Sequence, residues 1–306
     1  MQWMKAPSLM LALMCVWSSD APAKQLEHGV QRSADSWTIS VRWADAEGHT
    51  HRAEYELPTL EVRRDMNTPL KFRKAVAARY MAKEINKEMA GFRGVKINAW
   101  ATNSGVVRIK AKGKDGARVK EAIRQASEAQ EAALERYMAE HGYTYLGKKI
   151  VPDHARHVAE YAQGLASVVE ALGGPTPDPR DFSDLALAFV QTIPYERRAR
   201  VADLYRRPIS VLGRNKGDCD SKTVLFLALM RQAYPSLPLA IVYIPGHAFG
   251  AIGIDPARGD ARLRRRGETW VGVEPVGPAV HPAGELGRKS RKRARLGLYR
   301  IKVVQE

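Results

Sequence analysis

The pattern of apolar and polar positions in the first half of the chain predicts two β-hairpins. Apolar and polar residues alternate over 36–41 and 51–57, on either side of a turn-rich stretch that ends at Gly48, which is typical of a hairpin. The alternation recurs over 95–102 and 106–111, and Gly105 in the short connection can adopt the positive φ that such a turn needs.

Two helices are predicted beside these hairpins. Apolar residues recur close to helical spacing over 71–89, and a stretch rich in Ala, Glu, Gln and Arg over 115–141 predicts a long helix with a thin apolar stripe. We therefore expect residues 24–150 to form a smaller α+β module in the order ββαββα. No recognisable catalytic constellation falls within it.

The second half predicts a domain built around one buried helix. A helical pattern over 152–172 is followed by the breaker GGPTPDP, and another helix is predicted over 182–192. The segment 219–233 contains the run TVLFLALM, which is almost wholly apolar and has to be buried. Strand patterns follow at 239–244, 248–254, 270–273 and 298–304. This order favours an α+β catalytic domain over 151–306.

The first 23 residues have the features of a cleaved signal peptide. Lys5 precedes an apolar run from Leu9 to Trp17, and a small-x-small pattern ends at Ala23. The apolar run is about 10 residues long, whereas roughly 20 are needed to cross a bilayer. We therefore expect export and cleavage near Ala23, which leaves a periplasmic or secreted protein; an uncleaved membrane anchor is the alternative.

The cysteine count directs attention to one thiol. Cleavage near Ala23 removes Cys15 and leaves Cys219 alone, so no disulfide can form within the mature chain. An unpaired thiol in an oxidising compartment is a chemical liability unless it is buried or used. Cys219 is therefore the first candidate for chemistry.

The charge balance indicates an anionic partner or a solvated surface. The chain carries 49 Lys and Arg against 33 Asp and Glu, a net charge of +16. Two runs hold much of the excess, Arg262–Arg266 and Arg288–Arg295. Such runs suit an anionic cell-envelope surface, which we favour over nucleic acid. The plainer interpretation is a pair of solvated, mobile loops, because charge runs usually stay hydrated.

Thiol catalysis needs a thiolate, a base that accepts its proton and a group that orients the base. Cys219 lies where a Gly-rich loop ends and the buried helix begins, so the helix dipole should stabilise its thiolate and free amides there can bind an oxyanion. Gly217 would permit close approach of a substrate backbone, and Asp218 or Asp220 can cap the helix. Lys222 would either add positive charge or pair with Asp218.

A base and an orienting group are available on the predicted strands. His247 opens one strand, and Glu274 closes the strand after it. Because alternate residues of a strand share a face of the sheet, His247 lies on the same face as Phe249, and Glu274 lies on the same face as Trp270. If these strands are adjacent, the two side chains meet. Taken singly, each candidate is more often structural: a core cysteine, a satisfied histidine and a solvated glutamate.

The order of these residues resembles the core of the transglutaminase-like superfamily. The resemblance rests on three motifs: GDCDSK over 217–222 at the start of the buried helix, GHA over 246–248 and WVGVEP over 270–275. The upstream QTIPY over 191–195 is similar to the segment that precedes the cysteine in bacterial members. The resemblance covers roughly residues 180–278, about a third of the chain, and Glu274 stands where the family usually has Asp.

The resemblance implies a papain-like fold and acyl transfer through a thioester. Cys219 would attack an amide carbonyl, His247 would shuttle the proton and Glu274 would orient the histidine. Gln191 is an oxyanion candidate by analogy with papain-like enzymes. Because Ser221 and Lys222 follow Asp220, the calcium-binding acidic cluster of some bacterial proteinases of the family is not expected here.

The leading hypothesis is an exported thiol peptidase or amidase that acts on a protein or peptide substrate without a cofactor or metal. One alternative is a non-catalytic binding module that holds an anionic envelope partner through its basic runs. Another is a protein-crosslinking transglutaminase. His154 and His157 lie three residues apart on a predicted helix, but no acidic or cysteine partner is evident nearby, so we expect them on the surface rather than at a metal.

Overall fold

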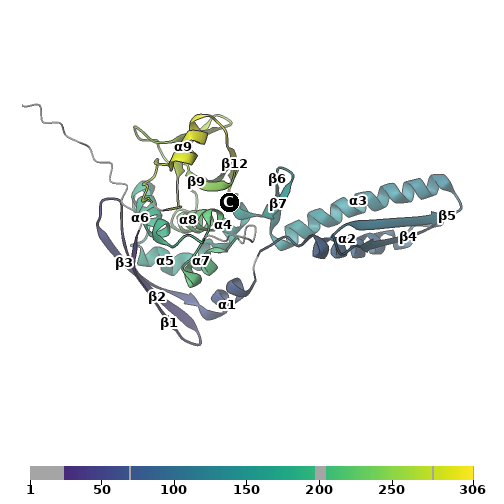
Figure 1. Ribbon diagram of the computed structural model, residues 1–306, viewed down its shortest axis with the longest axis horizontal. Helices are drawn as coiled ribbons and strands as arrows, with labels where there is room; N and C mark the ends of the chain where they lie inside the picture. The colour runs from purple at the N-terminus through teal and green to yellow at the C-terminus, as the bar shows by residue number, and fades with distance from the viewer. Residues whose placement is uncertain (1–23, 69, 197–204, 278, 306) are drawn as a thin grey trace, which may run out of the picture.

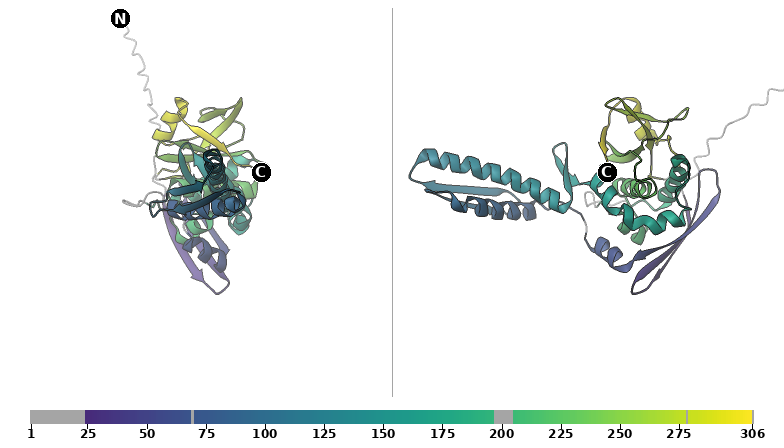
Figure 2. Two further views of the ribbon diagram at one scale, coloured as in Figure 1. Left: turned by 90° about the vertical axis from the view of Figure 1, so that its right-hand side faces the viewer. Right: turned by 180° about the vertical axis from the view of Figure 1, so that it is seen from behind.

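The protein consists of a body and a long projecting arm (Figure 1, Figure 2). The computed structural model describes residues 24–305 except 69, 197–204 and 278. The chain contains both helices and antiparallel strands, which confirms the α+β class. The predicted signal peptide over 1–23 lies outside the described residues. None of the helices in the described part of the chain is long and apolar enough to cross a membrane.

An antiparallel sheet opens the chain. It consists of β1 (Gln25–Arg32), β2 (Ser36–Ala44) and β3 (Thr50–Pro58). The predicted hairpin is β2 with β3, whose register runs from Ser36 opposite Pro58 to Ala44 opposite Thr50. Alternate residues of β2 are buried, as expected for a sheet with one face on a core. That face packs into the main core of the body.

A helical layer fills the centre of the body. It contains α1 (Thr59–Asn67), α4 (His154–Ala162), η2 (Gln163–Leu165), α5 (Ala166–Ala171), α6 (Pro179–Thr192), α7 (Pro208–Arg214) and α8 (Cys219–Ala233). As predicted from its apolar run, α8 is almost wholly buried from Ser221 to Arg231. The first two residues of this helix, Cys219 and Asp220, are only partly buried.

A five-stranded sheet covers α8. Its order is β10-β11-β9-β8-β12, with bounds β8 (Leu239–Ile244), β9 (His247–Ile252), β10 (Arg262–Arg265), β11 (Glu268–Val273) and β12 (Arg300–Val303). One face joins the main core with α8, and the other holds a second cluster that includes Phe249, Trp270 and Leu286. Helix α9 (Arg288–Arg295) lies over that second face, opposite α8 (Figure 1).

The arm is formed by α2 (Lys74–Glu88), η1 (Met89–Gly91), β4 (Val95–Ala101), β5 (Val107–Gly113) and α3 (Gly116–His141). Strands β4 and β5 form the second predicted hairpin. Alanines of α3 pack against α2 and the hairpin in cores of the arm's own. A short hairpin, β6 (Tyr143–Leu146) with β7 (Lys149–Pro152), leads back into the body.

The packing divides the chain differently from the expected boundary at residue 150. Strands β1–β3 and helix α1 contribute residues such as Trp43 and Val62 to the same core as Phe189 and Leu225. Among the described residues of 24–150, those of the arm, residues 74–141, instead form cores separate from the main core. The expected module over 24–150 therefore consists of a sheet that completes the body and an insertion that projects from it.

The two basic runs form a strand and a helix rather than the loops of the plainer interpretation, although most of their basic side chains are exposed to solvent as that interpretation expected. Arg262–Arg265 is the edge strand β10, where Leu263 is fully buried. Arg288–Arg295 is helix α9, where Ser290 is buried. One buried side chain in each run anchors its basic neighbours to the body.

Candidate functional site

The loop before α8 fixes the position of Cys219. Asp218 is the N-cap, and its carboxylate accepts hydrogen bonds from the Ser221 amide at 3.0 Å and the Ser221 hydroxyl at 2.5 Å. Such a cap satisfies amides that the first turn of a helix leaves without partners. The Gly217 amide donates to the Pro194 carbonyl at 3.3 Å, which ties this loop to the end of α6.

Gly217 is required by packing inside the protein. A Cβ at this position would lie 3.1 Å from Cγ of Lys222 and 3.3 Å from Cγ1 of Val211. The side of Gly217 that a Cβ would occupy is therefore filled by the protein's own side chains, and the close approach of a substrate backbone stays a prediction.

His247 and Glu274 are brought together by the pairing of β9 with β11. Gly250 lies opposite Val273 in that ladder, and Nε2 of His247 lies 2.8 Å from Oε1 of Glu274. The Glu274 side chain is buried, and its Oε2 accepts a hydrogen bond from the Ser290 hydroxyl at 2.6 Å. Both carboxylate oxygens therefore have partners, which fixes the carboxylate and leaves Nδ1 as the ring nitrogen on the far side from Glu274.

The thiol of Cys219 lies against the start of β9. The Ala248 amide hydrogen-bonds to the sulfur, and the Ala248 carbonyl accepts from the Thr223 hydroxyl at 3.3 Å. His247 shares its face of the sheet with Phe249, on the side of α9, whereas α8 packs on the other face. The thiol therefore contacts the residue that follows His247, and no hydrogen bond joins the thiol to the imidazole among the described residues.

The resting thiol is strongly protonated. Burial raises the pKa of Cys219 to about 12, and the carboxylates of Asp220 and Asp218 act in the same direction. The sulfur lies 3.5 Å from Oδ1 of Asp220, to which the thiol donates. The Ala248 amide opposes these effects. The sequence predicted a thiolate stabilised by the helix dipole; the adjacent carboxylates and burial instead favour the neutral thiol.

Tyr195 lies on the rim of this site. Its side chain hydrogen-bonds to Cys219, and burial, followed by the nearby Cys219, raises the pKa of the Tyr195 phenol to about 12. Tyr195 is also bridged to Gly217 in a short parallel pairing. Its ring remains substantially exposed, so it can contact a ligand that reaches the thiol.

Gln191 holds the strand end of Glu274 in place. Its amide nitrogen donates to the carbonyls of Glu274 and His281, both at 2.8 Å, and its oxygen accepts from the His281 amide at 3.1 Å. Both hydrogens of the buried Gln191 amide are therefore used by these two carbonyls. Gln191 thus positions the backbone of Glu274 and is not available as the oxyanion donor proposed from sequence.

Lys222 does not pair with Asp218, which was one of the two roles considered from sequence. Its ammonium is fully buried and donates to the carbonyls of Gln191 at 3.0 Å and Ile193 at 2.8 Å. Burial lowers the pKa of Lys222 to about 7, partly opposed by Glu274. Lys222 therefore ties α8 to the end of α6 beneath the site.

His154 and His157 are buried, contrary to the surface position expected. Nδ1 of His154 lies 2.9 Å from the Tyr243 hydroxyl, and its Nε2 lies 4.0 Å from Oδ2 of Asp220. His157 stacks on Tyr205. Burial lowers the pKa of His154 to about 4 and that of His157 to about 3. Helical spacing places both with Val158 on the apolar face of α4, a signal that identifies them as core residues.

One group of metal-ligand types occurs among the described residues. Asp45, Glu47 and His49, in the turn between β2 and β3, place ligand atoms within 4.8 Å of one another. The Asp45 carboxylate already accepts hydrogen bonds from the amides of Glu47 and His49, and it lies 2.7 Å from Nε2 of His51. The group is separate from the thiol site in sequence and in element.

Comparison with known proteins did not identify a family, so the functional assignment rests on the sequence motifs and the geometry of the site. No protein-family model matches the sequence. Searches of curated proteins and of solved structures likewise returned no match.

Proposed function

We propose that the protein is an exported thiol hydrolase of the transglutaminase-like kind, a peptidase or amidase with a papain-like catalytic core. The observation that carries the proposal is the contact between His247 and buried Glu274 at the strand end where the Cys219 thiol reaches Ala248. Support also comes from the sequence motifs around these residues and from α8 packed on an antiparallel sheet.

The protonated resting thiol favours general-base activation over a preformed ion pair. The proposed reaction requires the sulfur to leave Asp220 and to reach Nδ1 of His247. The imidazole would take the thiol proton as sulfur attacks the amide carbonyl, then give it to the departing amine. Water, deprotonated by the same imidazole, would release the acid product from the thioester and regenerate the thiol.

The first turn of α8 is the best source of oxyanion donors. Gln191 is committed to two carbonyls, and the Ser221 amide is taken by Asp218. The amides of Cys219 and Asp220 come earlier in the helix, where no intrahelical partner exists. These donors would stabilise negative charge as it develops on the carbonyl oxygen.

The proposal is tested by acetylation of the chain that begins at residue 24 with p-nitrophenyl acetate. We expect a burst of nitrophenol and an acetyl group on Cys219, detected by mass spectrometry. His247→Ala and Glu274→Gln should each slow acetylation by about 100-fold or more, because general-base catalysis contributes roughly that much. His49→Ala, an exposed histidine, is the matched control. Equal acetylation rates in all four proteins would contradict the proposal.

A non-catalytic binding module is the second candidate. It is favoured by the hydrogen bond of the thiol to Asp220 and by the raised pKa of Cys219. In that case Cys219 would acetylate no faster than an ordinary thiol. A crosslinking transglutaminase is distinguished by incorporation of a fluorescent primary amine into a glutamine-containing protein, whereas a hydrolase releases the acid instead.

A further inference from the structure

The C-terminal part of the body concentrates positive charge on one side of the site. Between Leu286 and Gln305 the chain contains eight Lys and Arg residues and no Asp or Glu. Six of the eight belong to α9, which has the sequence RKSRKRAR. Five of these six side chains are exposed, the exception being the half-buried Arg293.

The charge of α9 is not neutralised by the protein. In the part of the chain that the structure describes, no carboxylate forms an ion pair with any of its six cations. Arg291 donates instead to the Leu286 carbonyl. Like charges three and four residues apart on a helix repel each other, so a negatively charged ligand would stabilise α9 as well as bind to it.

Helix α9 contacts one residue of the proposed triad and the turn before another. Ser290, its buried polar residue, donates to Oε2 of Glu274 at 2.6 Å. Lys289, the preceding residue, lies with Nζ 3.4 Å from the carbonyl of Gly246, which immediately precedes His247. A ligand that spans α9 therefore lies within a few residues of the proposed reaction centre.

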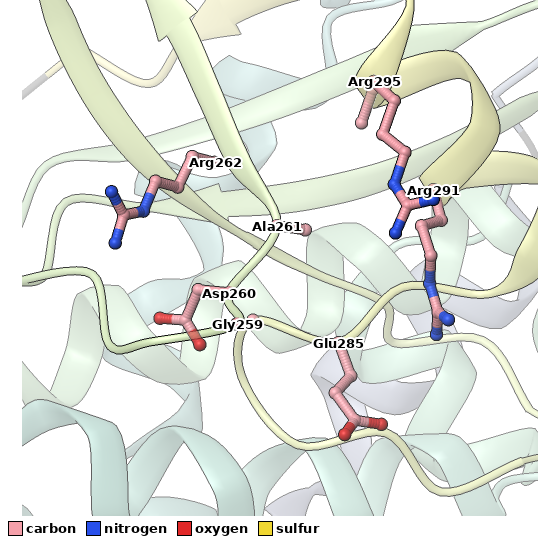
Figure 3. Close-up of a pocket in the computed structure, with 9 residues that line it drawn as sticks. Gly259, Asp260, Ala261, Arg262, Glu285, Arg291 and Arg295 are labelled. Carbon is pink, nitrogen blue, oxygen red and sulfur yellow. The ribbon is translucent and has the colours of Figure 1, made fainter.

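A cavity beside α9 extends the basic surface toward β10. It has a volume of about 270 Å³, and Figure 3 shows Arg291 and Arg295 descending from α9 on one side, with Arg262 and Asp260 on the other. Asp260 is paired with Arg180 at 2.8 Å, and Glu285 lies 3.6 Å from His281. The Asp260 carboxylate is thus compensated by Arg180, whereas Glu285 is an exposed carboxylate and Arg295 has no ion-pair partner among the described residues.

We propose that α9 and β10 form a docking surface for an acidic segment of a polypeptide substrate. The inference rests on the proposed function, because its argument is the contact of α9 with Glu274 and with the turn before His247. A bilayer is a poorer fit, since Ala294 is the only apolar residue within α9 and an interfacial helix needs an apolar face to insert. Exposed Leu296 and Leu298 offer apolar contacts beside the charges.

The test measures binding of a fluorescent peptide of alternating Glu and Gly to a Cys219→Ala chain beginning at residue 24, so no chemistry is required. Replacing Arg288, Lys292 and Arg295 by Gln should weaken binding about tenfold at low salt, and added salt should weaken wild-type binding. The matched control replaces Lys110, Lys112 and Lys114, which are exposed on the arm, and should change affinity less than about twofold.

Proximity to the thiol is tested separately on the chain that keeps Cys219. Saturating acidic peptide should slow acetylation of Cys219, and the α9 substitutions should remove that protection. Peptide binding that is equal in the α9 and arm variants would overturn the proposal. The proposal would also be overturned if the α9 variant bound the peptide normally but no longer bound phosphatidylglycerol vesicles or DNA. Failure of acetylation itself, with α9-dependent peptide binding retained, would overturn the proposed hydrolase instead.

Discussion

Asp220 has opposite effects on the fold and on the nucleophile. An acidic side chain in the first turn of α8 is favourable to the helix dipole. The same carboxylate accepts the thiol hydrogen and, after burial, is the largest cause of the raised pKa of Cys219. The resting site therefore keeps its sulfur neutral, which makes the Cys219 thiol less prone to oxidation.

Asp220→Asn should lower the pKa of Cys219, because it removes a negative charge that disfavours the thiolate. Each unit of decrease raises the thiolate fraction tenfold below the pKa, while the weaker nucleophile reacts about threefold more slowly. We therefore expect alkylation by iodoacetamide between pH 7 and 9 to accelerate about threefold per unit. Asp255→Asn, at an exposed position, is the control. An unchanged or slower rate in Asp220→Asn would show that Asp220 does not hold the thiol neutral.

The sequence suggested candidate residues for the site but not the environments in which the structure places them. Cys219, His247 and Glu274 follow from residue types at a helix start and two strand ends, and the strand pairing brings the last two together. Ser290 could not be predicted as a partner of Glu274, because it lies within a run of cations and reaches the site only through the docking of α9. The roles of Gln191 and Lys222 depend on loop carbonyls whose positions no local pattern encodes.

At the scale of elements, α4 buries two histidines that have to be neutral. Both lie in the main helical layer, where His154 contacts Tyr243 and His157 stacks on Tyr205. Folding lowers both pKa values below the ordinary value of 6.5. The unfolded chain therefore binds more protons than the folded chain between those values and 6.5, so stability is lost as the pH falls through this window.

We expect the free energy of unfolding to fall by a few kcal/mol between pH 6.5 and pH 4, since one pKa unit corresponds to about 1.4 kcal/mol. Asp184 opposes the trend, because burial raises its pKa to about 6. His157→Phe keeps the stacked ring and should make the free energy of unfolding less dependent on pH. His49→Gln should leave that dependence unchanged. Urea unfolding midpoints at pH 4.5 and pH 7 measure the difference. Parallel curves for wild type and His157→Phe would refute this account of α4.

Local patterns predicted the hairpins and long helices because these elements have one buried face. They did not predict β1, whose residues are mostly exposed, or α7, which begins at Pro208. They also grouped β2 and β3 with the arm, since adjacency in sequence does not reveal which core an element joins. The partners of β2 in the main core, such as Phe189, lie more than a hundred residues away.

At the scale of the whole molecule, the arm is an insertion with its own cores. Its helices and hairpin bury residues such as Ile85, Ala126 and Tyr137 against one another. The chain enters and leaves the arm at one place, because the rings of Phe72 and Tyr143 lie 5.4 Å apart between centroids. None of the proposed site residues comes from the arm.

Replacing residues 73–141 by a short Gly-Ser linker should therefore leave the body folded and the thiol site intact. A few residues suffice to join the two ends, since each extended residue spans about 3.3 Å. We expect cooperative thermal unfolding within about 5 °C of the intact protein and an unchanged rate of Cys219 acetylation. The arm expressed alone should be helical by circular dichroism, and the spectra of the two parts should sum to that of the whole. Loss of cooperative unfolding in the shortened chain would mean that the arm stabilises the body, and normal unfolding with slower acetylation would mean that it contributes to the reaction.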